Sequence, residues 1–312
     1  MKVLVTGADG FVGRHLVRQL GREGHRVVAA CRPHGPAADW KNGAVTVVPL
    51  ELTDQSSVRA ALETEPDAVV HLAAVASNRE ALADPVWAWT VNAAGTARLA
   101  EELGRRRSEG RTGARLLLVS SGEVYGPGSA APRRESDPIA PASPYAASKA
   151  GAELAVMEVW RRTGLPVVIA RPFTHTGPGQ ETRFVLPAFV ERMREAKATG
   201  IRRVRSGNLA PIRDLLDVRD VVAAYLLLLG SGEVGEIYNV SRGEGCSVGE
   251  LFERLARLIG AGVEPEVEPS LARPSDIPHL VGDSTKLRRT TGWTPARSLE
   301  QTLRGLVDAE AD

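Results

Sequence analysis

Short apolar runs separated by amphipathic stretches dominate the first half of the chain. Val3, Leu4 and Val5 open the pattern, and most later runs are followed by a segment with apolar residues at helical spacing. Such runs are typical of strands buried on both faces of a parallel sheet, with helices covering those faces. We therefore expect a doubly wound α/β fold. Further strands are expected at residues 26–30, 45–49, 68–72, 116–120 and 167–170.

The alternation fades after Arg171, where glycine, proline and arginine are scattered among shorter elements. A chain of 312 residues approaches the length at which a single hydrophobic core usually stops growing. We expect residues 1–172 to form a dinucleotide-binding domain, to which residues 214–240 return. Residues 173–312 are expected to form a smaller C-terminal lobe that binds the substrate.

Composition limits the partners. The chain has 39 Lys+Arg and 38 Asp+Glu, so no overall charge favours nucleic acid or an anionic membrane, and we expect a small-molecule partner. The arginine run at 105–107 is expected to be a solvated helix end, because no aromatic residue interleaves it. Cys31 and Cys246 lie far apart without further ligands, so neither a disulfide nor a metal site is predicted. No run is long enough to span a bilayer and no signal peptide is recognised, so a cytoplasmic location is expected.

A glycine motif follows the first expected strand. Gly7, Gly10 and Gly13 are spaced Gly-x-x-Gly-x-x-Gly and precede an amphipathic helix. Glycines permit a tight turn and close backbone approach, and a helix N-terminus attracts a pyrophosphate. The alternative is a tight strand-to-helix turn without a ligand. The context favours a dinucleotide site, and hence a sheet of the Rossmann type.

The end of the second expected strand bears on the cofactor. It reads Ala30-Cys31-Arg32 and lacks the Asp or Glu that binds the ribose hydroxyls of NAD. Arg32 can pair with the 2′-phosphate of NADP, and Arg14 can add a second positive charge. We therefore expect NADP(H) rather than NAD(H). The alternative is that both arginines point into solvent.

Three residues are candidates for catalysis. Tyr145 and Lys149 are four positions apart in a segment expected to be helical, so they share one face. The lysine charge is expected to favour the phenolate and to lower the pKa of Tyr145 from its ordinary value near 10. Ser121 follows the strand expected at 116–120, at the sheet edge where such folds bind ligands. Its hydroxyl can hold a substrate oxygen against Tyr145.

Together these motifs resemble the extended short-chain dehydrogenase/reductases, the nucleotide-sugar epimerase/dehydratase family. The resemblance implies that Ser121 and Tyr145 polarise the C4 oxygen of a nucleotide-linked sugar, that Lys149 supports Tyr145, and that hydride passes between the nicotinamide and the sugar C4. It also implies a homodimer formed by helices next to Asn92 and Tyr145. Further motifs that carry the resemblance are His71-Leu72-Ala73-Ala74, Val91-Asn92 with Gly95-Thr96, Val124-Tyr125-Gly126 and Arg171-Pro172.

The resemblance also implies binding roles. Glu51 stands where the family has an adenine-binding Asp, and Thr174 where it commonly has Asn. The arginines among the substrate residues suit a diphosphate, although structural salt bridges are an alternative. The implied cofactor-binding residues are Gly7, Gly10, Phe11, Val12, Gly13, Arg14, Arg32, Glu51, Leu52, Leu72, Ala73, Ala74, Asn92, Tyr145, Lys149 and Pro172; the implied substrate-binding residues are Ser121, Glu123, Thr174, His175, Asn208, Arg213, Arg273 and Asp276.

The segments 171–180, 207–220 and 273–283 resemble the branch of the family that reduces a 4-keto-6-deoxy sugar carried on GDP, giving a product of the GDP-rhamnose type. We therefore expect an NADPH-dependent C4 ketoreductase. A nucleotide-sugar 4,6-dehydratase, a C4 epimerase and a non-catalytic binding protein are the alternatives. Glu123 bears on the first of them, because dehydration needs an acid and a base. Dehydratases acting on dTDP-glucose carry an Asp-Glu pair here, which Gly122 breaks, whereas those acting on GDP-mannose keep only the Glu.

Overall fold

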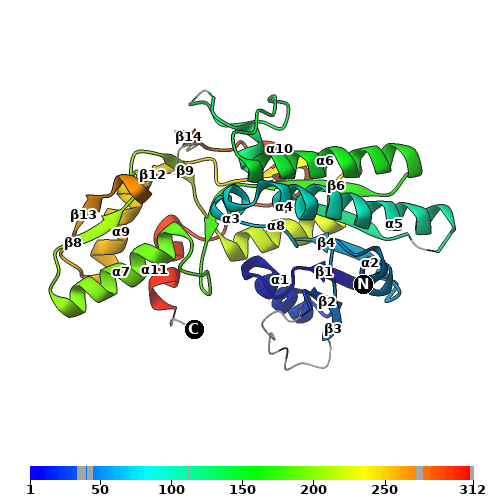
Figure 1. Ribbon diagram of the computed structural model, residues 1–312, viewed down its shortest axis with the longest axis horizontal. Coiled ribbons are helices and arrows are strands. Elements are labelled where there is room, and N and C mark those ends of the chain that lie inside the picture. Colours follow the sequence, from blue (N-terminus) through cyan, green and yellow to red (C-terminus); the bar gives the residue numbers. More distant parts are fainter. Residues whose placement is uncertain (34–39, 41–44, 112, 129, 272–276, 310–312) are drawn as a thin grey trace.

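The computed structural model describes residues 1–33, 40, 45–111, 113–128, 130–271 and 277–309. Its centre is a seven-stranded parallel sheet in the order β3-β2-β1-β4-β5-β6-β11, seen on the right of Figure 1. Six strands agree with the predicted ones to within two residues at either end, and the expected doubly wound α/β fold is confirmed. The strands are β1 Lys2–Thr6, β2 Arg26–Cys31, β3 Val45–Pro49, β4 Ala68–His71, β5 Arg115–Val119, β6 Val167–Pro172 and β11 Ile237–Val240.

Helices cover both faces of this sheet because the strand residues are apolar on both sides. Val3 and Val5 of β1 pack towards α1, α8 and α10, whereas Leu4 packs towards α2, α5 and α6. Burying a Val or Leu side chain fully contributes about 1.5–3 kcal/mol, so these two layers hold the sheet rigid. The helices are α1 Phe11–Arg22, α2 Gln55–Leu62, α5 Thr96–Ser108, α6 Pro144–Thr163, α8 Val218–Ser231 and α10 Thr285–Thr291.

The remaining elements form a group with its own hydrophobic core, on the left of Figure 1. Phe189 and Phe252 meet edge to face at its centre, with ring centroids 5.1 Å apart. The division of the chain at residue 172 stays a prediction. The elements of this group are α7 Val185–Thr199, α9 Val248–Ile259, α11 Leu299–Asp308, β8 Arg203–Ser206, β13 Glu264–Val267, β9 Ile212–Asp214, β12 Gly245–Ser247 and β14 His279–Leu280.

Between β4 and α5 the chain forms three short consecutive helices. These are α3 Asn78–Ala83, α4 Pro85–Trp89 and a π-helical turn, η1, at Thr90–Gly95. Single π-helical turns are rare and occur frequently at functional sites. The three helices α3, α4 and η1 lie side by side with α6 (Figure 1).

The arginine run at 105–107 lies at the end of α5, as expected, but the expectation that all of it is solvated is wrong. Arg106 is 3% exposed rather than solvated, because it lies on the inner side of α5. Its guanidinium donates to Glu102 Oε1 at 2.9 Å, to Glu63 Oε1 at 2.6 Å and to the carbonyl of Leu62 at 2.8 Å. The run therefore ties α5 to α2. In the described part of the chain, no helix is long and apolar enough to cross a membrane, and no group of three potential metal ligands is found.

Candidate active site

The glycine motif forms a cradle between β1 and α1. Gly7 has φ +66°, and a Cβ on it would lie 2.9 Å from the amide nitrogen of Ala73. A Cβ on Gly13 would lie 2.2 Å from the carbonyl oxygen of Gly7. Gly10 precedes α1 and no side chain caps the helix there. A tight cradle that admits only glycine, below a helix end without a side-chain cap, fits the pyrophosphate of a dinucleotide.

A buried hydrogen-bond network joins this cradle to the loop after β4. Thr6 Oγ1 accepts from the amides of Leu72 and Ala73, both at 3.1 Å, so its own proton is directed to His71 Nδ1 at 2.7 Å. The other ring nitrogen of His71 then donates to Thr96 Oγ1 at 2.9 Å. Burial lowers the pKa of His71 to about 3. His71 is therefore a neutral structural link between β1, β4 and α5.

Asn92, in the π-helical turn, is occupied by protein groups. Its side-chain oxygen accepts from the amide of Val75 at 2.7 Å, and its nitrogen donates to the Val75 carbonyl at 3.1 Å and to Ser148 Oγ at 2.9 Å. The residue is 1% exposed. Both amide protons of Asn92 therefore have protein partners, and its expected role in cofactor binding stays a prediction. Asn92 holds the loop after β4 against α6, through Ser148, which the sequence interpretation missed.

The catalytic candidates on α6 are placed by its first two turns. Ser143 caps the helix by accepting from the amide of Ala146, and Pro144 starts it, so Tyr145 lies in the first turn and Lys149 one turn later on the same face. Lys149 is 5% exposed, and its Nζ donates to the carbonyl of Val119 at 2.5 Å. Burial lowers the pKa of Lys149 to about 8.

Ser121 and Tyr145 form the reactive pair. Ser121 follows β5, and its Oγ accepts from the amide of Glu123 at 3.1 Å, which leaves its proton to donate. Ser121 lies beside the Tyr145 phenol and favours its ionised form, yet burial first, and then the charge of Glu123, raise the pKa of Tyr145 well above its ordinary value. The expected lowering of this pKa by Lys149 is therefore wrong in the free protein. Tyr145 therefore holds its proton at neutral pH, and it can give that proton only to an oxygen on which negative charge develops.

Glu123 has a partner that no sequence pattern indicated. It lies in η2, a 3₁₀ turn at Gly122–Tyr125, and its Oε2 accepts from Asn78 Nδ2 at 2.7 Å. Asn78 is the first residue of α3, in the loop region that Asn92 holds in place through Val75. The structure thus brings together Ser121, Glu123 and Tyr145, as predicted, and adds Asn78.

A buried ion pair between Arg171 and Glu153 ties the end of β6 to α6. Arg171 binds Glu153 of α6 through two hydrogen bonds of 2.9 and 2.6 Å, and also donates to the Tyr125 hydroxyl at 2.9 Å. That hydroxyl donates to Asn239 Oδ1 of β11 at 2.7 Å. The Arg-Pro motif therefore has a structural role: it ties α6 to β6, to β11 and to the η2 turn after β5. Pro172 ends β6 and is buried.

The remaining cofactor candidates lie at the C-terminal ends of neighbouring strands. Arg14 Nε donates to the carbonyl of Asp9 at 2.8 Å, and Arg32 is exposed after β2. Glu51 Oε1 accepts from Thr53 at 2.9 Å. Phe11 and Val12 begin α1, Leu52 is buried below Gly95, and Ala74 lies in the loop after β4.

The substrate candidates after β6 are divided between two places. His175 stacks on Phe11 with ring centroids 6.3 Å apart, and one ring nitrogen hydrogen-bonds the Phe173 carbonyl at 2.9 Å. The neighbouring Thr174 carbonyl accepts from Leu216 at 2.9 Å. Both residues therefore lie next to the glycine cradle.

The other substrate candidates lie beyond β8. Asn208 is exposed and its side-chain oxygen accepts from the amide of Ala210 at 3.0 Å. Arg213 donates to the carbonyls of Ile212 and Ile277 at 2.9 and 2.6 Å. Arg273 and Asp276 lie outside the described residues, so their roles stay predictions.

The parallel sheet, the glycine cradle and the Ser121, Tyr145 and Lys149 group together define an enzyme of the short-chain dehydrogenase/reductase type with a nicotinamide dinucleotide cofactor. Comparison with known proteins supports this enzyme class. A family model described as GDP-mannose 4,6 dehydratase matches residues 4–306. The chain therefore belongs to this family of the extended short-chain dehydrogenase/reductases, whose members modify nucleotide sugars.

Two solved structures and one curated relative illustrate the range of activities among similar proteins. GDP-6-deoxy-D-mannose reductase of Pseudomonas aeruginosa is 34% identical, with 98% of this chain and 96% of that protein covered. The structure of RMD from P. aeruginosa complexed with NADPH has a TM-score of 0.82 at 32% identity, covering 98% and 97% of the two chains. Thermus thermophilus UDP-glucose 4-epimerase complexed with NAD has a TM-score of 0.88 at 31% identity, covering 99% and 98%.

Proposed function

We propose that this protein is an NADPH-dependent reductase of the C4 keto group in a 4-keto-6-deoxy sugar carried on GDP, with a product of the GDP-rhamnose type. The observation that carries the proposal is the placement of the Ser121 hydroxyl, directly after β5, beside the Tyr145 phenol in the first turn of α6. Ketone reduction needs a proton donor at the carbonyl oxygen. The similarity to GDP-6-deoxy-D-mannose reductase supports this choice of substrate.

The side chains divide the work as follows. NADPH, when bound, supplies the hydride. Ser121 donates a hydrogen bond to the ketone oxygen, and Tyr145 delivers its proton to the same oxygen as negative charge develops there. Lys149, held by the Val119 carbonyl, places a positive charge at the cofactor end of α6. Asn92 and Ser148 hold that helix against the loop after β4.

A dehydratase is the second candidate, and the packing around Gly122 speaks against one form of it. A Cβ on Gly122 would lie 3.1 Å from the ring of Phe173, which is itself 2% exposed. A side chain at this position would require the buried ring to shift by a few tenths of an ångström. The site therefore supports one carboxylate, Glu123, and lacks the Asp-Glu pair that dehydratases acting on dTDP-glucose use as acid and base.

The preference for NADPH over NADH rests on Arg32. It lies exposed directly after β2, where a carboxylate would bind the ribose of NAD, and its guanidinium suits a phosphate. Arg14 is anchored to the Asp9 carbonyl nearby in the chain and supplies a second positive charge.

Purified protein, incubated with NADPH and 4-keto-6-deoxy sugars carried on GDP, dTDP or UDP, tests the proposal directly. We expect one NADPH consumed per GDP-linked ketone and a 6-deoxy alcohol as product. Conversion of GDP-mannose to its 4-keto-6-deoxy form without net NADPH use would instead show a dehydratase. Tight NADPH binding without any turnover on the whole panel would favour a non-catalytic protein.

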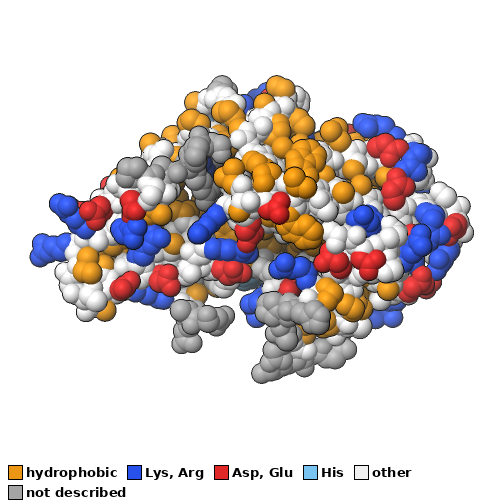
Figure 2. Space-filling view, viewed as in Figure 1, with side chains coloured by type: hydrophobic (Ala, Val, Ile, Leu, Met, Phe, Trp, Pro, Cys, Tyr) orange, Lys and Arg blue, Asp and Glu red, His pale blue; other side chains and the backbone are white. Residues whose placement is uncertain are grey.

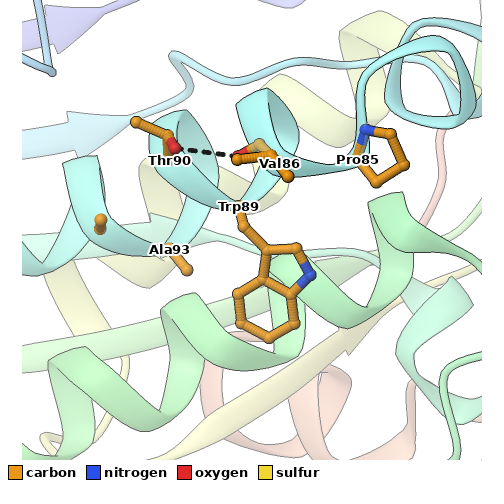
Figure 3. A pocket seen from close by; sticks show the side chains of 6 residues that line it. Pro85, Val86, Trp89, Thr90 and Ala93 are labelled. Atoms are coloured by element: carbon orange, nitrogen blue, oxygen red, sulfur yellow. Dashed lines mark hydrogen bonds between the residues drawn. The ribbon is translucent and has the colours of Figure 1, made fainter.

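We further propose that the protein acts in the cytoplasm as a homodimer. Apolar side chains gather over α4 and α6 in Figure 2. Val86 is 76% and Leu154 67% exposed, although both are large and apolar. Beside them, Trp89 packs on Gly151 of α6 and borders a shallow hollow lined by Pro85, Thr90 and Ala93 (Figure 3). Exposed apolar patches of this kind are typical of protein interfaces.

Light scattering on the purified protein tests the dimer. Val86→Asp combined with Leu154→Asp should give monomers, because two charges would be buried in the interface. Val267→Asp is the matched control, since Val267 is 59% exposed on β13 in the other group of elements. A parent that is monomeric, or a double variant that stays dimeric, would exclude this face.

A further inference from the structure

The side chain of Asn78 is only half used by the protein. Its nitrogen donates to Glu123 at 2.7 Å, but its oxygen, Oδ1, is buried and has no hydrogen-bond partner among the described residues. A buried carbonyl oxygen without a donor loses the hydrogen bond it would make to water, so such atoms are uncommon in folded proteins. Oxygens of this kind, next to a reactive centre, indicate a missing donor.

The position of Asn78 is rigidly set. Val75, three residues earlier, is held through both its amide and its carbonyl by Asn92. At the start of the helix that begins at Asn78, Ser77 caps the chain by accepting from the amide of Glu80. The side chain of Asn78, not the helix end, therefore carries the argument.

The neighbouring carboxylate lies beside the reactive pair. The amide of Glu123 donates to Ser121 Oγ, and its charge acts on the Tyr145 phenol. Asn78 Oδ1 and the Glu123 carboxylate are thus two acceptors adjoining the place where Ser121 and Tyr145 hold a carbonyl. A ligand group that satisfies them must donate a hydrogen bond.

We propose that Asn78 is a specificity-determining residue, which together with Glu123 accepts a hydrogen bond from the substrate hydroxyl on the carbon next to the reacting carbonyl. This rests on the proposed function. In a 4-keto-6-deoxy sugar, the two neighbours of the C4 carbonyl differ: C3 carries a hydroxyl, whereas C5 carries a methyl group. Only the C3 hydroxyl can donate, so the pair recognises it and rejects a substrate without it.

A thermodynamic cycle tests this inference. The Asn78 side chain and the substrate's C3 hydroxyl are removed one at a time and then together. The parent and Asn78→Ala are each assayed with GDP-4-keto-6-deoxymannose and with its 3-deoxy analogue. We expect Asn78→Ala to lower kcat/KM roughly tenfold or more on the first substrate, because the C3 hydroxyl loses its acceptor, and less than about twofold on the analogue, which has no hydroxyl there to lose a partner. Arg79→Ala, an exposed neighbour on the same helix, is the control and should change neither value.

Two outcomes would overturn the inference. Equal losses of kcat/KM on both substrates would make Asn78 a purely structural residue. Unchanged rates would show that water, not the substrate, donates to Asn78 Oδ1. Asn78→Ser, which keeps a small polar side chain, guards against a folding defect and should fold like the parent in a thermal melt. Calorimetric titration of GDP-mannose and GDP-3-deoxymannose into the same variants measures the hydroxyl contact without turnover. If the parent reduces no ketone, the proposed function fails, and this titration alone decides the role of Asn78.

Discussion

Lys149 gives the sharpest test of the electrostatics, because its charge is buried at the expense of stability. Burial lowers its pKa from 10.5 to about 8, and the side chain is 5% exposed. At 1.36 kcal/mol per pKa unit, this difference corresponds to about 3 kcal/mol of unfavourable free energy in the folded state. Lys149→Met removes the charge but keeps the length of the side chain.

The pH dependence separates this charge effect from other consequences of the substitution. Below pH 8 lysine is protonated in both the folded and unfolded states, so the parent bears the full cost. Between pH 8 and 10.5 the folded state loses its proton first, and the stability of the parent relative to the variant rises with pH. The variant also leaves the Val119 carbonyl without a donor, at about 1–3 kcal/mol, but that contribution is independent of pH.

We therefore expect Lys149→Met to be as stable as the parent, or up to about 2 kcal/mol more stable, at pH 7, and to lose about 3 kcal/mol relative to it by pH 10.5. Turnover and cofactor affinity should both fall. Urea unfolding at several pH values between 7 and 10.5 measures the difference. Lys197→Met is the control, because Lys197 is exposed and also donates to a backbone carbonyl, that of Ile259 at 2.6 Å. A difference in unfolding free energy that stays constant over this range would refute the reasoning.

Three further changes test the assignments. Tyr145→Phe should lower turnover by several orders of magnitude while NADPH binding, followed by its fluorescence, survives; activity within tenfold of the parent would remove Tyr145 from its role. Arg32→Asp should weaken NADPH binding roughly tenfold to hundredfold and favour NADH, as measured by cofactor titration. A parent that already binds NADH more tightly than NADPH would contradict this role of Arg32. Glu123→Gln should reduce ketone reduction only modestly, because Gln keeps a hydrogen-bond acceptor; abolition of a GDP-mannose dehydration activity would make Glu123 a catalytic base.

Much of the fold and the reactive centre could be predicted because the relevant signals are local. Continuous apolar runs such as Leu116 to Val119 leave little choice other than a strand buried on both faces. The glycine spacing and the four-residue interval from Tyr145 to Lys149 are likewise fixed by backbone geometry. The bounds of the seventh strand could not be predicted in the same way, because Ile237–Val240 is short and pairs with β6 from far along the chain.

The features that the sequence interpretation missed depend on which segments meet. Asn78 belongs to no motif, and it matters only because the loop after β4 reaches the turn after β5. The pKa of Tyr145 follows from enclosure and from Glu123, not from the lysine one turn away. Arg106 looks like part of a solvated run until α2 places Glu63 and a carbonyl against it.

The π-helical turn lies between the proposed active site and the proposed dimer face. On its inner side, Asn92 fixes both the loop that leads to Asn78 and, through Ser148, the helix that carries Tyr145. Its outer side contributes Thr90 and Ala93 to the apolar hollow on the proposed dimer face. A π-helical turn is intrinsically less favourable than α-helix, so packing on both sides must hold it in place. On the proposed interface, a second copy would supply the outer packing, and the dimer would thereby steady the active site of each subunit.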